Sequence, residues 1–184
     1  MGPMTAAARF LDILRDLMQE AGGVSEPAKL GCSLHGSLAF TGKGHATDRA
    51  VILGLIGCLP ETLDPDEAAK SVALVHANMR IQPPGLPELT FDPENDLIFD
   101  YGPALTGHAN GMVLSAFDEN GNSILQEIYY SIGGGFVVTE TELREIDRGA
   151  DSLHAAKVAD GYPYPFGSAA AMLQMGATSG SSIA

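Results

Sequence analysis

Two strand-like stretches on either side of an Asn-Gly pair constrain the fold of this chain more than any other feature. The first stretch runs from Gly111 to Phe117, the second runs from Ser123 to Tyr130, and Asn120-Gly121 lies between them. An Asn-Gly pair is typical of tight hairpin turns, because its residues tolerate the positive φ angles that such turns need. The sequence therefore predicts an antiparallel β-hairpin.

Helical patterns lie on both sides of this hairpin. Apolar residues recur at helical spacing after Pro3, and the stripe ends before Gly22-Gly23. Asp64 and Pro65 suit an N-cap and a first helical position. The predicted helices are Pro3 to Met18, Asp48 to Cys58, Asp64 to Met79, Thr139 to Arg148, and Ser168 to Met175. The second of these is apolar on nearly all sides.

The remaining strand candidates complete an α+β pattern. They are Lys29 to Phe40, Leu89 to Phe91, Asp96 to Asp100, and Phe136 to Val138, with a proline-rich loop at Gln82 to Pro87. This order predicts a two-layer α+β domain, in which helices pack on one face of a mainly antiparallel or mixed sheet. We expect residues 1–160 to form this domain. Residues 161–184 should be a linker and the start of a further domain, with Ala177 to Ala184 disordered.

Composition limits the classes of partner. The formal net charge of −13 at pH 7 makes nucleic acid and anionic membranes unsuitable partners, because binding them needs positive patches. The longest apolar run, Ala50 to Leu59, is shorter than the roughly 20 residues of a membrane-spanning helix. Cys32 and Cys58 lie far apart in the sequence, so we expect the chain to hold no metal and no iron–sulfur cluster by itself.

The segment from Gly36 to Asp48 combines features that suit a small anion and a proton. Lys43 brings a positive charge, Gly44 allows close approach of a ligand, and His45 can carry a proton near neutral pH. Thr47 and Asp48 open the next helix, whose N-terminal N–H groups favour anions. The segment is not a P-loop, because Gly44 stands where that motif needs Ser or Thr. An ordinary strand-to-helix turn with an exposed histidine fits the same residues.

Two further segments place polar residues and glycines next to strands. His108 and Asn110 precede the first hairpin strand, where an imidazole beside an amide could act as acid or base. Ser131, Gly133 and Gly134 follow the second hairpin strand. A simple turn at Asn110 and a bulge or close packing at the glycines are the structural alternatives. We expect His45, His108 and the triple glycine Gly133 to Gly135 to lie within one cleft or on one face, and placement of the two histidine segments at opposite ends of the sheet would rule out a shared site.

The chain resembles the beta domain of bacterial iron–sulfur L-serine dehydratases. The resemblance runs in order from about Gly2 to Phe166, and it lies in the segments Gly2-Pro3-Met4, Gly36 to His45, Thr47-Asp48, His108 with Asn110 to Met112, Ser115 to Asp118, and Tyr129 to Phe136. The family usually carries Ser-Ser-Ser-His-Thr before Gly-Pro-Met, and this chain begins at Met1-Gly2-Pro3-Met4. The same fold also resembles the effector-binding domain of some phosphoglycerate dehydrogenases.

The resemblance implies a function that this chain would share with a second domain. A larger alpha domain would hold a 4Fe–4S cluster through its own cysteines, and L-serine would be converted to pyruvate and ammonia. His45 and His108 are the expected catalytic residues. The expected substrate-binding residues are Lys43, Gly44, Thr47, Asp48, Asn110, Ser131, Gly133 and Gly134.

Three interpretations stay open from the sequence. In the first, this chain is a beta domain that is inactive without the alpha domain, in a cytoplasmic enzyme for which a homodimer is left open. In the second, it is a regulatory module that binds serine or a similar small anion without catalysis. In the third, it is a dimerisation domain whose glycine loops only pack.

Overall fold

The computed structural model describes residues 1–20, 25–159, 161 and 166–180, with the backbone alone for 150–159. Gly22-Gly23, most of the expected linker and the last four residues lie outside this description. The chain divides into two units, Met1–Glu140 and Thr141–Ala184. The first unit contains all the expected site residues.

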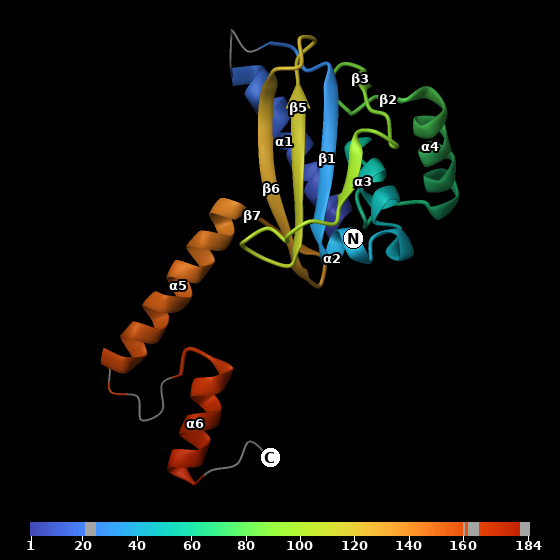
Figure 1. The fold of residues 1–184 in the computed structure, drawn as a ribbon. Coiled ribbons are helices and arrows are strands. Elements are labelled where there is room, and N and C mark those ends of the chain that lie inside the picture. The colour runs from blue at the N-terminus through green and yellow to red at the C-terminus, as the bar shows by residue number, and fades with distance from the viewer. Residues whose placement is uncertain (21–24, 160, 162–165, 181–184) are drawn as a thin grey trace. The chain divides into compact units, whose positions relative to one another are not determined.

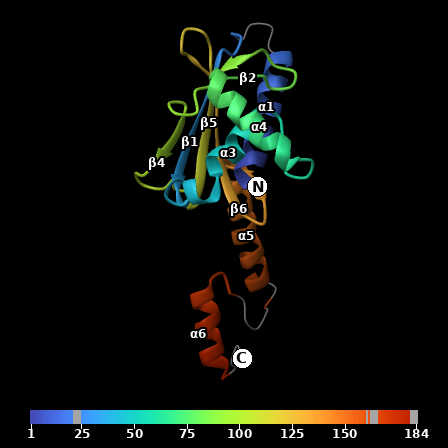
Figure 2. The same ribbon diagram turned by 90° about the vertical axis from the view of Figure 1, so that its right-hand side faces the viewer.

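The described part of the first unit is a seven-stranded mixed sheet with helices on one face (Figure 1). The strands are β1 (Lys29–Gly36), β2 (Arg80–Ile81), β3 (Leu89–Thr90), β4 (Leu97–Asp100), β5 (Asn110–Phe117), β6 (Ser123–Gly133) and β7 (Phe136–Thr139). The helices are α1 (Gly2–Glu20), α2 (Ser37–Phe40), the 3₁₀ turn η1 (Lys43–His45), α3 (Thr47–Leu55) and α4 (Pro65–Asn78). Figure 2 shows α1, α3 and α4 on one side of the sheet. The predicted α+β class is confirmed.

Strand β1 is the central strand of the sheet. It pairs in parallel with β3 and β4, and antiparallel with β5. The predicted hairpin is confirmed, since β5 and β6 pair antiparallel and the turn residue Gly121 has a φ of 81°. A second hairpin joins β6 to β7 through Gly134 and Gly135, whose φ angles are 61° and 86°. Positive φ at both central residues is the requirement of a tight two-residue hairpin turn, and glycine meets it without strain.

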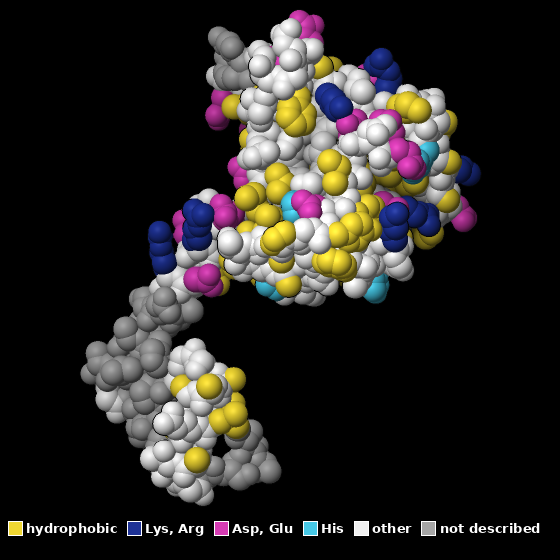
Figure 3. Space-filling model, in the orientation of Figure 1, with side chains coloured by type: hydrophobic (Ala, Val, Ile, Leu, Met, Phe, Trp, Pro, Cys, Tyr) yellow, Lys and Arg dark blue, Asp and Glu magenta, His cyan; other side chains and the backbone are white. Residues whose placement is uncertain are grey.

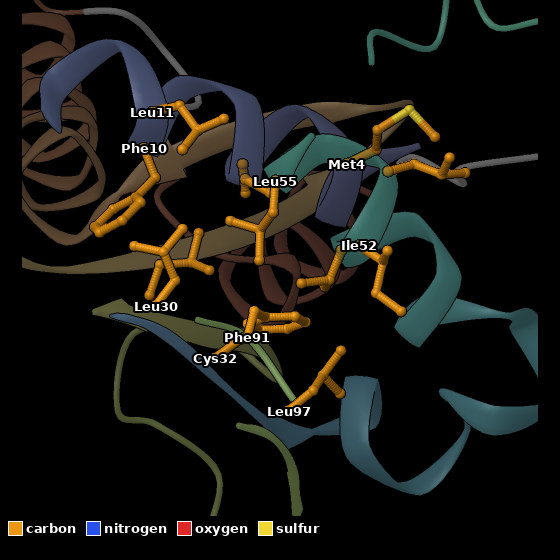
Figure 4. Close-up of a cluster of buried hydrophobic side chains, with 14 of the residues drawn as sticks. Met4, Phe10, Leu11, Leu30, Cys32, Ile52, Leu55, Phe91 and Leu97 are labelled. Atoms are coloured by element: carbon orange, nitrogen blue, oxygen red, sulfur yellow. The ribbon is translucent and has the colours of Figure 1, made fainter. Parts of the chain in front are cut away.

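The core lies between the sheet and helices α1 and α3. Alternate residues of β1 (Leu30, Cys32 and Leu34) are buried on the helix side, as the period of a strand requires. Figure 4 shows some of them facing Phe10 and Leu11 of α1 and Leu55 of α3. Burial raises the pKa of the Cys32 thiol to about 12, so this cysteine is an inert core residue.

Helices α1 and α3 approach each other closely at Gly54. A Cβ atom added there would meet the Met4 carbonyl oxygen and would come within 2.6 Å of the Ala7 Cβ atom. The two helices therefore pack backbone against backbone at this point. The segment from Asp48 to Cys58 is apolar because this close packing buries it.

The opposite face of the sheet carries no helix within the described part of the first unit. Ile98 of β4 is 54% exposed there, and Val113 and Ile128 form a half-buried cross-strand pair on β5 and β6. Figure 3 shows hydrophobic side chains over this face. No described helix is long and apolar enough to cross a membrane.

Three predicted element boundaries in the first unit are wrong by three or more residues, and one of them is the end of the second hairpin strand, which continues past Tyr130 to Gly133. The strand expected from Lys29 to Phe40 ends at Gly36, whose φ of 56° and ψ of −130° turn the chain into the short helix α2. The helix expected from Asp48 to Cys58 is α3, which ends at Leu55, because Ile56 leaves the helical conformation and Gly57 has a φ of 86°. In the latter two places a glycine takes a conformation that other residues rarely adopt.

The helix predicted at Asp64 forms as expected. The Asp64 carboxylate accepts hydrogen bonds from the N–H groups of Asp66 (2.9 Å) and Glu67 (3.4 Å), so Asp64 is the N-cap of α4. The Glu67 side chain pairs with Lys70 at 2.7 Å.

The second unit contains two helices, α5 (Glu140–Ala159) and α6 (Ala169–Ser179). Both are longer than predicted. Gly149 does not interrupt α5, and α6 runs to Ser179 because Gly180, with a φ of 70°, forms its C-cap. The expectation of disorder is therefore wrong for Ala177 to Ser179.

The turn between β5 and β6 predicts a measurable dependence of stability on pH. Hydrogen bonds from the Asn122 side chain, then from the Asn122 N–H, hold the pKa of Asp118 below its usual value of 3.8. A carboxyl group with a lowered folded-state pKa stabilises the fold above its unfolded pKa, and this contribution disappears as the pH falls through the folded pKa.

We expect the free energy of unfolding of Asp118→Asn to fall less than that of the wild type when the pH is lowered below about 4, because the variant has no carboxylate to protonate at this position. Urea unfolding at pH 7 and pH 3 measures it, with Glu119→Gln in the same turn as the control. If the free energy of unfolding falls by the same amount between pH 7 and pH 3 in the wild type and in Asp118→Asn, the lowered pKa of Asp118 does not contribute to the stability of the fold.

Candidate functional site

The three polar segments of the sequence lie at one end of the sheet. Gly36, the last residue of β1, pairs with Asn110, the first residue of β5. The Ser37 N–H donates to the Ala109 carbonyl oxygen at 2.8 Å, which joins the start of α2 to the segment of His108. Because β6 runs antiparallel to β5, the β6–β7 turn lies at this same end. The three segments thus lie at the same end of the sheet, as a shared site would require.

His45 is an exposed residue whose ring has a fixed hydrogen-bond partner. Its Nδ1 lies 2.9 Å from the Thr41 carbonyl oxygen. A carbonyl oxygen can only accept a hydrogen bond, so Nδ1 carries the proton in this contact. In the neutral ring, Nε2 then keeps its lone pair, which is the arrangement of a histidine that can take up a proton.

His108 has the opposite arrangement. Its Nδ1 accepts a hydrogen bond from the Asn110 N–H at 3.1 Å. In the neutral ring the proton then lies on Nε2, which can donate a hydrogen bond. His45 and His108 therefore present a proton acceptor and a hydrogen-bond donor, whereas the third histidine at this end, His35, has its ring nitrogens beside the Ser33 hydroxyl (2.9 Å) and the Asp100 carboxylate (3.5 Å).

The remaining residues near His108 are held by the backbone of β6 and by α1. The Asn110 side chain donates to the Ser131 carbonyl oxygen at 3.2 Å. A Cβ atom on Gly2 would collide with the Ser131 side chain, so the first turn of α1 packs tightly against this strand. Gly133, with a φ of 102°, and Gly134 continue into the exposed β6–β7 turn.

Lys43 and Asp48 line a hollow of about 360 Å³ between η1, α3, α4 and the β3–β4 connection. Its described lining includes His76 and Glu94 but neither His45 nor His108. The structure thus brings the predicted residues to one end of the sheet, and it does not place them all in one cavity.

The N-terminus of α3 is largely occupied by its own chain. Thr47 is buried and its N–H donates to the Gly42 carbonyl oxygen at 2.9 Å. The Arg49 N–H donates to the Asp48 carboxylate at 2.8 Å. The N-cap residue is Ala46, and no side-chain hydrogen bond caps this helix. Gly44 is exposed with open space around it.

Sequence reasoning missed the role of Tyr130. Tyr129 and Tyr130 are both fully buried although neighbours on a strand face opposite sides of the sheet. Tyr129 faces the core, and Tyr130 lies under the segment of Gly107, whose N–H donates to the Tyr130 hydroxyl at 3.3 Å. Gly107 has no room for a side chain, because a Cβ atom would lie 2.6 Å from the tyrosine ring. Two adjacent tyrosines on a predicted strand were the available signal that both faces are covered here.

The residues of this chain do not fit an iron–sulfur cluster. Cys32 is buried in the core, and Cys58 lies after α3 with a pKa that burial raises. Cluster ligands are thiolates grouped around the metal. No group of three metal-ligating side chains occurs among the described residues.

The family model and the related proteins that match this chain all point to the same family. Residues 1–142 match the model of the family described as serine dehydratase beta chain. The chain is 37% identical over 178 residues to an L-serine dehydratase of Helicobacter pylori, 38% over 167 residues to one of Streptomyces coelicolor, and 37% over 175 residues to L-serine dehydratase 1 of Escherichia coli.

These alignments cover 95%, 91% and 94% of this chain, and 35% of each relative. The chain thus spans about a third of the length of the curated relatives that it matches. Because residues 1–142, which include every expected site residue, match this family model, the chain belongs to the serine dehydratase beta chain family.

Proposed function

We propose that this chain is the beta domain of an L-serine dehydratase and supplies acid–base groups to a reaction centre shared with a second domain. The observation that carries the proposal is the hydrogen bonding of His45 and His108 at one end of the sheet. His45 has its Nδ1 proton held by a backbone carbonyl group, and His108 has its Nδ1 occupied by a backbone N–H.

The reaction needs a proton taken from the α carbon of L-serine and loss of the β hydroxyl as water. The resulting aminoacrylate converts to its imine and then hydrolyses to pyruvate and ammonia. In the proposal, Nε2 of His45 takes the α proton, and the Nε2–H of His108 donates a hydrogen bond that orients the substrate, with Asn110 fixing its ring. Gly44, Ser131, Gly133 and Gly134 belong to the surrounding substrate-facing surface, whereas the buried Thr47 holds the start of α3 through the bond from its N–H to Gly42.

The second domain completes the site in this proposal. About two thirds of the length of each relative lies outside the matched part, which leaves room for such a domain. We assign the 4Fe–4S cluster to it, because the cysteines here do not form a ligand set. Residues 1–160 would be the beta domain, with 161–184 leading into the partner, and the intact enzyme would be cytoplasmic and homodimeric.

A complementation experiment tests the proposal. We expect the purified chain alone to be colourless and unable to deaminate serine. Adding the separately produced remainder of a relative, reconstituted with iron and sulfide under anaerobic conditions, should restore pyruvate formation. Brown colour in this chain alone, or no activity from the mixture when the two parts form a stable complex, would overturn it.

A further inference from the structure

A serine, a histidine and an aspartate lie side by side on the sheet face that carries no helix within the described part of the first unit. Ser33 and His35 are two residues apart on β1, so their side chains leave the same face of the sheet, opposite to the buried Leu34. Asp100 is the residue of β4 that pairs with His35. Two paired strands therefore hold the three polar side chains together.

The contacts of the His35 ring orient both of its nitrogen atoms. Nε2 lies 2.9 Å from the Ser33 hydroxyl oxygen, and Nδ1 lies 3.5 Å from Oδ2 of Asp100. The carboxylate favours a proton on Nδ1, because an ionised carboxylate accepts hydrogen bonds and cannot donate them. In the neutral ring Nε2 then keeps its lone pair, so the Ser33 hydroxyl donates to it.

Asp100 is itself held by the backbone. Its Oδ1 accepts the Gly102 N–H at 2.7 Å, which leaves Oδ2 for the His35 ring. The distance of 3.5 Å between Oδ2 and Nδ1 is longer than a hydrogen bond, and contacts between catalytic groups are often this loose before a substrate binds. A serine, a base and an orienting carboxylate in this order form the arrangement of serine nucleophiles on several unrelated folds.

Ser33 also lines a hollow of about 290 Å³ on this face of the sheet. Its volume is close to the lower end of the range of small-molecule sites, which suits a short acyl group. The apolar side chains of its lining are Ile98, Val113 and Phe117. Gln126, in the same lining, donates one amide N–H to the Ser115 hydroxyl at 3.2 Å, and its second amide N–H can donate to a bound carbonyl oxygen.

We propose that Ser33 is a nucleophile with His35 as its general base, and that it hydrolyses small acyl esters. The Ser33 oxygen attacks the carbonyl carbon while Nε2 of His35 takes the hydroxyl proton. The ester C–O bond then breaks, and His35 gives this proton to the leaving alcohol. Water attacks the acyl-Ser33 ester and gives a proton to His35, and the acid leaves as Ser33 recovers its proton. The hydrolysis is separate from the reaction of His45 and His108.

Two reagents test this inference on the 184-residue chain. Diisopropyl fluorophosphate attaches to serine nucleophiles with loss of fluoride, and p-nitrophenyl acetate reports ester hydrolysis. We expect one label per chain, located by mass spectrometry on the peptide that contains Ser33. Ser33→Ala should remove the label and lower the hydrolysis rate at least about tenfold, to the rate that the remaining histidine rings support.

Two variants test the roles of the base and of the carboxylate. His35→Gln keeps a hydrogen-bond partner for Ser33 but cannot take up a proton, so the labelling rate should fall at least about 100-fold. Asp100→Asn keeps an oxygen for the Gly102 N–H, and it should lower kcat for the ester at least about fivefold with KM unchanged. Circular dichroism of each variant separates a loss of reactivity from unfolding.

Ser123→Ala and His76→Gln are the matched controls. Both residues are exposed and lie outside the lining of this hollow, so these variants should be labelled and should hydrolyse the ester like the wild type. Label shared equally between Ser33 and Ser123 would overturn the inference, as would an unchanged labelling rate in His35→Gln. Neither reagent involves L-serine or the second domain, so these outcomes are independent of the complementation experiment.

Discussion

Replacing His45 with alanine in the intact enzyme should lower kcat at least about 100-fold, because removal of a general base typically costs 10²–10⁴ in rate. The expected loss follows from the ring geometry, in which the Nδ1 contact with the Thr41 carbonyl group leaves Nε2 as the proton acceptor. The measurement is steady-state pyruvate formation at saturating L-serine. Absorbance of the iron–sulfur cluster that we propose for the partner domain, measured in the same sample, checks that this domain is intact.

His45→Asn is the matched control for a structural role. An asparagine amide can keep the donor near the Nδ1 position, and thus the hydrogen bond to Thr41, but it cannot take up a proton near neutral pH. We therefore expect both variants to lose activity to a similar extent. If His45→Asn retains wild-type kcat while His45→Ala does not, the ring serves only to hold the segment between α2 and α3. If both retain it, His45 has no part in the reaction.

Replacing Gly54 with valine should destabilise the chain by about 3 kcal/mol or more, at the upper end of the usual cost of overpacking a core. Even the first added carbon would meet the Met4 carbonyl oxygen and would lie 2.6 Å from the Ala7 Cβ atom. Neither α1 nor α3 can move apart without opening the core that both share with β1. Such a loss is a large part of the 5–15 kcal/mol that holds a typical domain folded.

Urea unfolding followed by circular dichroism measures this effect, with Gly44→Val as the control. Gly44 has open space where its Cβ would be, so this variant should stay within about 0.5 kcal/mol of wild type. A midpoint for Gly54→Val equal to that of Gly44→Val would show that the two helices are not in contact at Gly54.

Local sequence features predicted those parts of the fold that local interactions determine. Asn120-Gly121 specified its hairpin, and Asp64 specified the start of α4, because in both cases the residues that make the hydrogen bonds are close in sequence. The end of β1 was missed for the opposite reason. Gly36 turns the chain beside Ala109, which lies far along the sequence, and no pattern near Gly36 records that neighbour. The two-residue strand β2 is too short to show any period.

The candidate site shows the same division. The glycine-containing segments next to strands pointed to His45 and His108, and the pairing of β1, β5 and β6 brings them to one end of the sheet. The proton positions on the two rings could not be predicted, because they depend on the contacts with Thr41 and with the Asn110 N–H. His76 and Glu94 carry no motif, and their place beside Lys43 arises only from the packing of α4 and the β3–β4 connection.

The central position of β1 has a consequence for how the chain can fold as it is synthesised. Its partners β4 and β5 begin at Leu97 and Asn110, more than sixty residues after β1 begins at Lys29. Until these partners leave the ribosome, the only strand partner of β1 is the short β3, which pairs with it at Lys29, and its apolar residues have only α1 and α3 to cover them. Such a wide separation between paired strands slows folding and exposes aggregation-prone edges. A chain interrupted before Phe117 should therefore aggregate, whereas one that extends through β7 should have every strand partner it needs.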